Sequence, residues 1–168
     1  MKKIGLFYSI NTKKTAQTAK RIVESFGSEN IDEINVEELT EKQFLGYDNI
    51  ILGVPTWFDG ELPNYWDEFV PALDDLDLRG KKVAIYGAGN QKDYPENFVD
   101  AVGIMSQLVE KQGAKVIGHT SVKGYTFESS KAKQGDVFVG LALDFENQVS
   151  MNKERIASWC EQLIKEFQ

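Results

Sequence analysis

The chain has 168 residues, a length that suits one compact domain with a complete core. Its residues are 42% hydrophobic and 27% charged, and no apolar run approaches the roughly 20 residues that cross a bilayer, so we expect a cytoplasmic protein without membrane insertion. The net charge of −7 disfavours nucleic acid as a partner, and the single cysteine, Cys160, excludes an internal disulfide and clusters held by several thiolates.

The first predicted strand, residues 4–8, ends in a polar turn, and helical spacing of apolar residues begins directly after it. Free backbone N–H groups and the helix dipole make such a turn a receptor for phosphate. Its side chains add hydrogen-bond donors and positive charge: Ser9, Asn11, Thr12, Lys13, Lys14 and Thr15. An ordinary helix capped by Thr12 explains the turn equally well. A P-loop would need glycine in place of Tyr8 and Lys13, and a dinucleotide fingerprint would need glycines that the turn lacks.

The middle of the chain continues to alternate strand and helix. The pattern predicts a strand over 31–36, a brief polar helix over 37–45, a strand over 49–54, a loop over 55–62, and a helix from Asn64 with Trp66, Phe69, Val70 and Leu73 on its core face. The strand over 49–54 is a continuous apolar run, which is typical of a strand covered on both faces.

The second half repeats this alternation, with one interruption. We expect a strand over 82–87, a loop over 88–97, a helix ending near Gln112, a strand over 114–118, an insertion over 119–137, a resumed strand over 138–143 and a helix over 152–167. Five parallel strands alternating with helices predict one doubly wound α/β domain over residues 1–168, with right-handed crossovers.

Ligands of such sheets lie beyond the carboxyl ends of the strands. Three loops meet there: the phosphate turn, residues 55–62 and residues 88–97. The second and third loops each carry an aromatic residue, Trp57 and Tyr94, and two rings on neighbouring loops can enclose a flat heterocycle. A ligand with a phosphate group and such a ring is better matched by flavin mononucleotide (FMN) than by ATP, because the sequence shows no evident lysine and magnesium-binding residues of the kind that bind ATP.

Charge is distributed unevenly along the chain. Residues 1–23 carry six basic and no acidic side chains, whereas residues 59–77 carry seven acidic and no basic ones. Such an acidic surface favours docking onto basic protein partners, although solubility alone explains it as well. We expect His119 and Cys160 to be structural, since no nucleophile accompanies the histidine and the cysteine lies in an apolar helical stripe.

At this point the sequence resembles a family, the long-chain flavodoxins of cyanobacteria and algae. The motifs that carry the resemblance are Pro55-Thr56-Trp57 with Gly60-Glu61-Leu62, Gly87-Ala88-Gly89-Asn90-Gln91 with Tyr94 and Asn97-Phe98, and the segments from Gly124 to Ala132 and from Phe138 to Asp144. The resemblance implies a flavodoxin-like three-layer α/β/α sandwich with strand order 2-1-3-4-5 and a fifth strand split by the insertion. It also implies a monomeric FMN-containing carrier of single electrons, not an enzyme, which replaces ferredoxin between photosystem I and ferredoxin–NADP reductase.

The resemblance assigns the cofactor contacts residue by residue. It places phosphate on Ser9, Ile10, Asn11, Thr12, Lys13, Lys14 and Thr15, and the flavin ring between Trp57 and Tyr94 on loops that include Pro55, Phe58, Asp59 and Gly60. Thr56 and Glu146 would approach the ribityl chain, and Gly89, Asn90 and Asn97 the pyrimidine edge.

Several residues depart from the family's pattern. Ile10 and Lys13 replace a threonine and a glycine of the phosphate turn, which affects the affinity more than the mode of binding. Asn90 stands where an acid is common, Asp93 replaces a frequent glycine, and Asp59 replaces a neutral residue. Two other functions stay open: a flavin-dependent quinone reductase of similar fold, which would consume NAD(P)H, and an interaction or phosphate-binding module without flavin. We expect the insertion to contact partners.

Overall fold

A parallel β-sheet forms the middle layer of the computed structural model, which describes residues 1–168. Its strands are β1 (Ile4–Tyr8), β2 (Ile31–Asn35), β3 (Asn49–Gly53), β4 (Lys82–Ala88), β5 (Lys115–Ile117) and β9 (Leu141–Leu143). The order is β2-β1-β3-β4-β5, as the family resemblance implies. Both β5 and β9 pair with β4: Lys82–Ala84 align with β5, and Tyr86–Ala88 align with β9. The fifth strand position is therefore split in two, which confirms that expectation.

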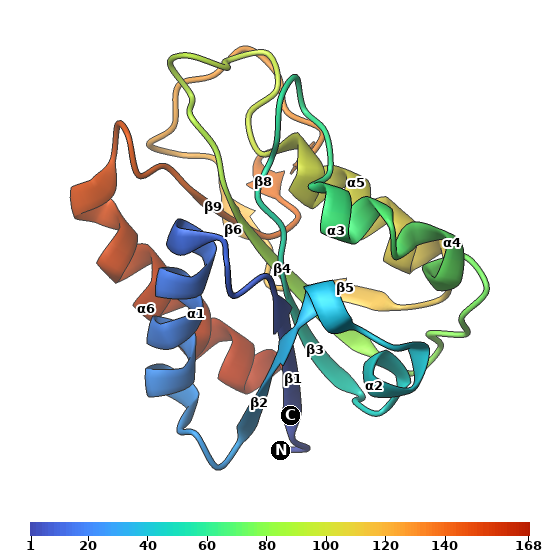
Figure 1. Cartoon of the computed structure of the whole chain (residues 1–168). Helices are drawn as coiled ribbons and strands as arrows, with labels where there is room; N and C mark the ends of the chain where they lie inside the picture. The colour runs from blue at the N-terminus through green and yellow to red at the C-terminus, as the bar shows by residue number, and fades with distance from the viewer.

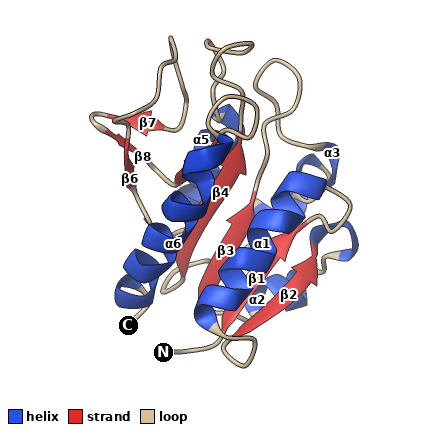
Figure 2. Cartoon of the chain, turned by 90° about the vertical axis from the view of Figure 1, so that its left-hand side faces the viewer, coloured by secondary structure: helices blue, strands red, loops and turns tan.

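Two layers of helices cover this sheet (Figure 1). Helices α1 (Lys13–Phe26) and α6 (Val149–Glu166) lie on one face, while α3 (Asn64–Asp67), α4 (Val70–Leu73) and α5 (Asp100–Lys111) lie on the other. The alternation of β1 fits this arrangement, because Leu6 belongs to the core cluster that contains the buried α1 and α6 residues, whereas Phe7 belongs to the opposite cluster and packs against Phe44 of α2 (Glu41–Leu45) with ring centres 5.2 Å apart. Figure 2 shows α1 and α6 side by side in front of the strands. No helix is long and apolar enough to cross a membrane.

Two predicted helices prove to be interrupted. The helix predicted from Asn64 is divided into α3 and α4, because Pro71 has no N–H to donate to the carbonyl of Asp67. The polar helix predicted over 37–45 consists of the 3-10 turn η1 (Val36–Glu38) and the helix α2 (Glu41–Leu45). Thr40 starts α2 with a capping box, since its hydroxyl accepts the Gln43 N–H at 3.2 Å while the Gln43 side chain accepts the Thr40 N–H at 2.9 Å.

The insertion forms a small antiparallel sheet with the strand order β6-β8-β7. Its strands are β6 (Thr120–Ser121), β7 (Lys133–Gln134) and β8 (Val137–Phe138). The backbone of Lys131 approaches α5 at Gly103, where a Cβ would lie 2.2 Å from the Lys131 carbonyl group. Only glycine allows this contact, so the insertion packs directly onto the domain. Figure 2 shows the insertion strands beside α5 and the upper end of β4.

Candidate functional site

Loops from the carboxyl ends of β1, β3 and β4 enclose a groove at one edge of the sheet. One cavity of about 400 Å³ is lined by Thr12, Lys13, Lys14, Thr15, Pro55, Thr56, Trp57, Ala88, Gly89, Asn90, Tyr94 and Glu146. A second cavity of about 340 Å³ is lined by Thr56, Trp57, Phe58, Gly89, Asn90, Tyr94 and Asn97. The cavities share five residues, so they are two parts of one groove, which we call the rim groove. It brings together thirteen of the residues singled out from the sequence, and Ser9, Ile10, Asn11, Asp59 and Gly60 do not line it.

One end of the rim groove is the N-terminus of α1. Thr12 occupies the N-cap position, but its side chain makes no capping hydrogen bond, and its hydroxyl lies 3.3 Å from the hydroxyl of Tyr65. The first helical hydrogen bond runs from the Ala16 N–H to the Thr12 carbonyl, 2.9 Å. No protein acceptor lies within hydrogen-bond distance of the N–H groups of residues 13–15. These free N–H groups and the positive helix end suit an anion.

Ser9 and Asn11 shape the turn from behind instead of lining the groove. The Ser9 hydroxyl is buried and accepts the Asn11 N–H at 3.3 Å. The Asn11 side chain donates to the Glu37 carboxylate at 2.5 Å, and Ile10 projects outward with 56% of its surface exposed. These residues therefore hold the turn in place. The predicted alternative of a helix capped by the Thr12 side chain is wrong in its geometry, because that hydroxyl is directed to Tyr65.

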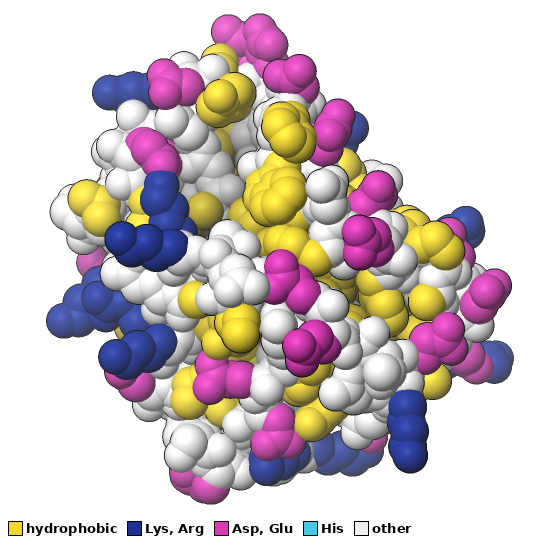
Figure 3. Space-filling model, in the orientation of Figure 1, with side chains coloured by type: hydrophobic (Ala, Val, Ile, Leu, Met, Phe, Trp, Pro, Cys, Tyr) yellow, Lys and Arg dark blue, Asp and Glu magenta, His cyan; other side chains and the backbone are white.

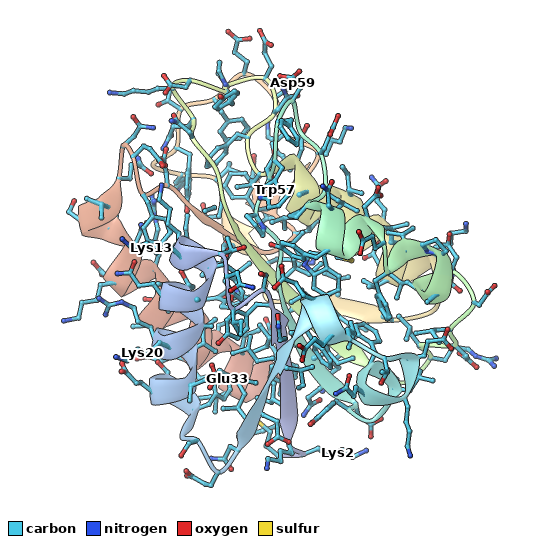
Figure 4. The ribbon with its side chains drawn as sticks, in the orientation of Figure 1. Lys2, Lys13, Lys20, Glu33, Trp57 and Asp59 are labelled. Carbon is cyan, nitrogen blue, oxygen red and sulfur yellow. The ribbon has the colours of Figure 1, made fainter.

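Lys14 and Glu146 face each other across the groove. The Lys14 ammonium forms an ion pair with the Glu146 carboxylate and lies 5.8 Å from the centre of the Phe145 ring. Both side chains are partly exposed, so the pair can open at little cost in free energy. Lys13 has no carboxylate partner and stands in the first turn of α1, where Figure 4 labels it.

The other end of the groove is framed by aromatic side chains. Trp57 packs edge-on against Tyr65, with ring centres 5.6 Å apart and an interplanar angle of 88°. Tyr94 is 52% exposed in a turn that is closed by its own N–H, which donates to the Asn90 carbonyl at 2.9 Å. Trp57 and Tyr94 line the same cavity, and because Trp57 is half-buried and Tyr94 is exposed, each leaves surface free for a flat ligand.

Residues 58–60 form a tight hairpin outside Trp57. The Trp57 N–H donates to the Glu61 carbonyl at 2.9 Å, and the Glu61 N–H donates back at 2.8 Å. Phe58 and Gly60 have φ of +47° and +94°, and a Cβ on Gly60 would lie 2.7 Å from the Asp100 carboxylate. This backbone requires glycine at position 60. Asp59 lies at the outer tip of the loop, farther out than Trp57 (Figure 4).

Acidic and basic side chains separate around this edge (Figure 3). Dark blue basic groups gather on the left over α1 and α6, whereas magenta acidic groups lie above the yellow hydrophobic patch and to its right. The acidic stretch Asp59–Asp77 occupies the loop and helices α3 and α4. The apolar opening of the rim groove is thus bordered by negative charge on the side away from α1.

Sequence reasoning assigned no role to three residues that support the groove: Tyr65, Asp144 and Asn147. Tyr65 receives the Thr12 contact, and burial raises its pKa to about 12. Asn147 donates to the Asn90 side chain at 2.9 Å and to Asp144 at 2.9 Å. The sequence signals for Asp144 were its position directly after the apolar strand over 138–143 and its place at the end of a family motif, neither of which indicated its hydrogen bonds.

Two larger cavities, each of about 510 Å³, lie outside the rim groove. One is between the insertion and α6, around Tyr125 and Arg155, and the other is beside Gln91 and Phe127. Both border the N-terminal end of α6, through Ser150 and Met151 in the first and Gln148 in the second, but neither is lined by the loops that follow β1 and β3. The rim groove combines the N-terminus of α1 with two accessible rings, and it is the best candidate site.

Comparison with known proteins agrees with this geometry. A family model described as flavodoxin matches residues 6–159. The chain is 44% identical to a flavodoxin of Trichodesmium erythraeum and 42% identical to one of Nostoc, covering 99% of this chain in both cases and 99% and 98% of those proteins. The crystal structure of Fusobacterium nucleatum flavodoxin bound to flavin mononucleotide is 34% identical, covers 100% of both chains and has a TM-score of 0.94. The chain belongs to the flavodoxin family.

Proposed function

We propose that this chain binds FMN in the rim groove and carries single electrons between redox proteins. The observation that carries the proposal is the groove itself, which runs from the free N–H groups of α1 to the accessible rings of Trp57 and Tyr94. The bound flavin mononucleotide of the similar Fusobacterium protein supports the same cofactor here. The whole chain, residues 1–168, would act as one monomeric FMN-binding domain.

The phosphate of FMN would lie at the N-terminus of α1. The N–H groups of residues 13–15 would donate to it, and Lys13 would add charge without first breaking an ion pair. Lys14 would exchange its partner Glu146 for the phosphate or share it, which leaves Glu146 free to meet the ribityl hydroxyls together with Thr56. Ser9, Ile10, Asn11 and Thr12 would contribute mainly by fixing the turn.

The flavin ring would lie between Trp57 and Tyr94. Groove-lining residues of the same two loops would surround its edge: Pro55, Phe58, Gly89, Asn90 and Asn97. Asp59 and Gly60, which do not line the groove, would approach the ring through the 58–60 hairpin. The Asn90 side chain accepts hydrogen bonds from Asn147, Lys92 and Asp93, so it is held rigidly beside the groove. Asp59 in place of a neutral residue, and Asn90 in place of an acid, would adjust the local charge in opposite directions.

Bound FMN supplies the redox chemistry, so the protein needs no nucleophile or general base of its own. Its residues would hold the ring, exclude water from one edge, and offer backbone groups of the 58–60 hairpin to the ring nitrogens. The glycine at position 60 lets that hairpin change its peptide orientation at low cost in strain. The surrounding carboxylates would make the addition of negative charge to the ring less favourable.

The partners in this proposal are redox proteins with basic docking surfaces. Acidic side chains of residues 59–77 border the exposed part of the groove, which suits electrostatic steering of such partners and a binding rate that falls with salt. More specifically, the protein would act in the cytoplasm as a substitute for ferredoxin and would carry electrons from photosystem I to ferredoxin–NADP reductase. The resemblance to cyanobacterial flavodoxins supports this role.

An absorption spectrum of the purified protein during stepwise reduction tests the core of the proposal. We expect a yellow protein with one FMN per chain, two resolved one-electron steps, and no steady consumption of NAD(P)H without a partner reductase. Steady NAD(P)H oxidation with a quinone would instead indicate a reductase. A colourless protein that takes up no added FMN would indicate a module without flavin. The rate at which ferredoxin–NADP reductase reduces the protein, compared with the rate for an unrelated flavoprotein reductase, tests the proposed partnership with ferredoxin–NADP reductase.

A further inference from the structure

The carboxylate of Asp144 organises three segments of chain beneath the rim groove. It follows β9 directly, is 0% exposed, and its Oδ2 accepts the Gln91 backbone N–H at 3.1 Å and the Gln91 side-chain amide at 2.8 Å. Its Oδ1 accepts the backbone N–H groups of Glu146 and Asn147 at 3.1 and 3.0 Å. Burial alone would raise its pKa, but the donors from Asn147 and Gln91 outweigh it and lower the pKa. Asp144 is therefore a fixed negative anchor.

The side chain of Gln91 connects this anchor to the insertion. Its Nε2 donates to Asp144, and its Oε1 accepts the Thr126 N–H at 2.6 Å. Gln91 is buried, so water cannot replace either bond without entering the interior. Only a side chain with one donor and one acceptor at this reach satisfies both partners at once. Glutamate would place a second carboxylate against Asp144, and leucine would leave both partners unpaired.

The turn that carries Tyr94 begins at this point. The backbone carbonyl of Asn90 accepts a hydrogen bond from the Tyr94 N–H at 2.9 Å. Its side-chain oxygen accepts one from the Asn147 side-chain amide, also at 2.9 Å. At the far end of the turn, the Pro95 carbonyl accepts the N–H groups of Glu128 and Ser129 at 2.8 and 3.0 Å. The Tyr94 turn is thus held at one end through Gln91 and at the other by the insertion backbone. The ring of Tyr94 itself projects from between these two attachments.

We propose that Gln91 is a positioning residue that joins the insertion to the Tyr94 turn and thereby fixes the Tyr94 ring against the bound flavin. The inference rests on the proposed function and gives the insertion a role within the chain, in addition to the expected contact with partners. If Gln91 holds the turn, its loss moves the ring without removing any group that touches the cofactor. The effect is then seen in flavin affinity and in the two one-electron potentials.

The experiment compares Gln91→Leu and Gln91→Glu with a matched control, Gln162→Leu. Gln162 is also a glutamine bonded to the insertion, since its amide donates to the His119 carbonyl at 2.9 Å, but it lies on α6 away from the groove. We expect FMN dissociation constants at least about tenfold larger for both Gln91 variants, which is the ratio given by one lost charge-assisted hydrogen bond. The first one-electron potential and the visible circular dichroism of bound FMN shift as well, and Gln162→Leu leaves all three unchanged.

A second pair of variants leaves Gln91 itself intact. Thr126→Pro removes the N–H that Gln91 accepts, whereas Thr126→Ala keeps it, and Thr126 is exposed and does not line the rim groove. This pair decides the question if the Gln91 variants do not fold. We expect the potential and the circular dichroism to shift in Thr126→Pro and to stay unchanged in Thr126→Ala.

Three outcomes are separated by these measurements. The inference is overturned, while the proposed function stands, if folded Gln91→Leu keeps the affinity, potentials and circular dichroism of the wild type. If Gln91→Leu does not fold, the same result in Thr126→Pro overturns it. Equal shifts in Gln91→Leu and Gln162→Leu also overturn it, because they indicate general loosening of the insertion. Failure of the wild-type protein to bind FMN refutes the proposed function itself.

Discussion

The hydroxyl of Thr12 lies 3.3 Å from the hydroxyl of Tyr65, although Thr12 occupies the position from which a threonine normally caps its own helix. The contact links the start of α1 to α3, which lies on the opposite face of the sheet. It leaves the first N–H groups of α1 without a side-chain acceptor. In a protein that binds phosphate at this point, an uncapped helix end is an advantage, because a capping side chain would compete with the ligand.

A first prediction follows from this uncapped end. Thr12→Ala should cost the FMN-free protein less than about 0.5 kcal/mol in free energy of unfolding, whereas loss of a functioning N-cap typically costs about 1 kcal/mol. Thr40→Ala is the matched variant, because Thr40 does cap α2. Urea denaturation of both FMN-free variants measures the difference. A loss at Thr12 as large as that at Thr40 would show that Thr12 stabilises the free helix after all.

Much of this fold was predictable from residue patterns, and the reasons are local. Continuous apolar runs identified β1 and β3, and helical spacing identified α1 and α6, because these elements bury regular faces of their own. The break between α3 and α4 is also encoded locally, because Pro71 interrupts the helical hydrogen bonds. The loops that follow the carboxyl ends of the strands could be predicted to form the candidate site, because parallel strands all end at the same edge of the sheet.

The long-range contacts could not be derived in that way. The Thr12–Tyr65 contact joins residues 53 positions apart, and the Gln91–Asp144 bonds also span 53 positions. Such pairs depend on how the helices pack and on the path of the insertion, which no local period encodes. The residue pattern predicted both a strand over 114–118 and a resumed strand over 138–143. That β5 and β9 share the fifth position beside β4 came from the family resemblance, because strand pairing is not encoded in a local pattern.

A second prediction concerns the stacking role of Trp57. Trp57→Ala should weaken FMN binding by about 1–3 kcal/mol, the range measured for loss of one aromatic stacking partner. The Trp57–Glu61 backbone bonds do not involve the side chain, so the loop should keep its path. Titration of the FMN-free protein with FMN, followed by flavin fluorescence, measures the change. Trp57→Phe should recover part of the affinity, and unchanged binding in Trp57→Ala would place the ring elsewhere.

A third prediction concerns the charge of Asp59. A unit charge at ~8 Å in an effective dielectric of ~20 contributes about 2 kcal/mol, which is on the order of 90 mV for one electron. Asp59 is exposed, so solvent and salt reduce this upper figure to tens of millivolts. Asp59→Asn should therefore raise the second one-electron potential by that amount. Glu24→Gln, an exposed charge near the far end of α1, should leave it unchanged in the same redox titration. Equal potentials in wild type and Asp59→Asn would contradict the prediction.

The fourth prediction uses two buried carboxyl groups whose pKa values shift in opposite directions. Burial raises the pKa of Asp100, although the Lys131 N–H that it accepts at 2.8 Å works against this. A raised pKa in the folded state means that the ionised form is disfavoured there. The stability that Asp100 contributes is therefore present below its unfolded pKa of about 3.9 and is lost as pH rises through its folded pKa. Asp144 has a lowered pKa, and its contribution is present above about pH 4 and lost as pH falls through its folded pKa.

Asparagine at either position keeps the shape of the side chain and removes the charge. At pH 7, Asp100→Asn should make the protein more stable than wild type, because the amide avoids burial of a charge and still accepts the Lys131 N–H. Asp144→Asn should make it less stable, because one end of the amide must face the donors of Gln91 and Asn147 with its own N–H groups. Urea unfolding of the three proteins at pH 7 and near pH 4 checks both signs. The Asp100→Asn difference should shrink near pH 4, whereas the Asp144→Asn difference should largely persist there and shrink only as the pH falls further. If Asp100→Asn were destabilising at pH 7, the Asp100 carboxylate would have to gain more from its hydrogen bonds than it loses through burial.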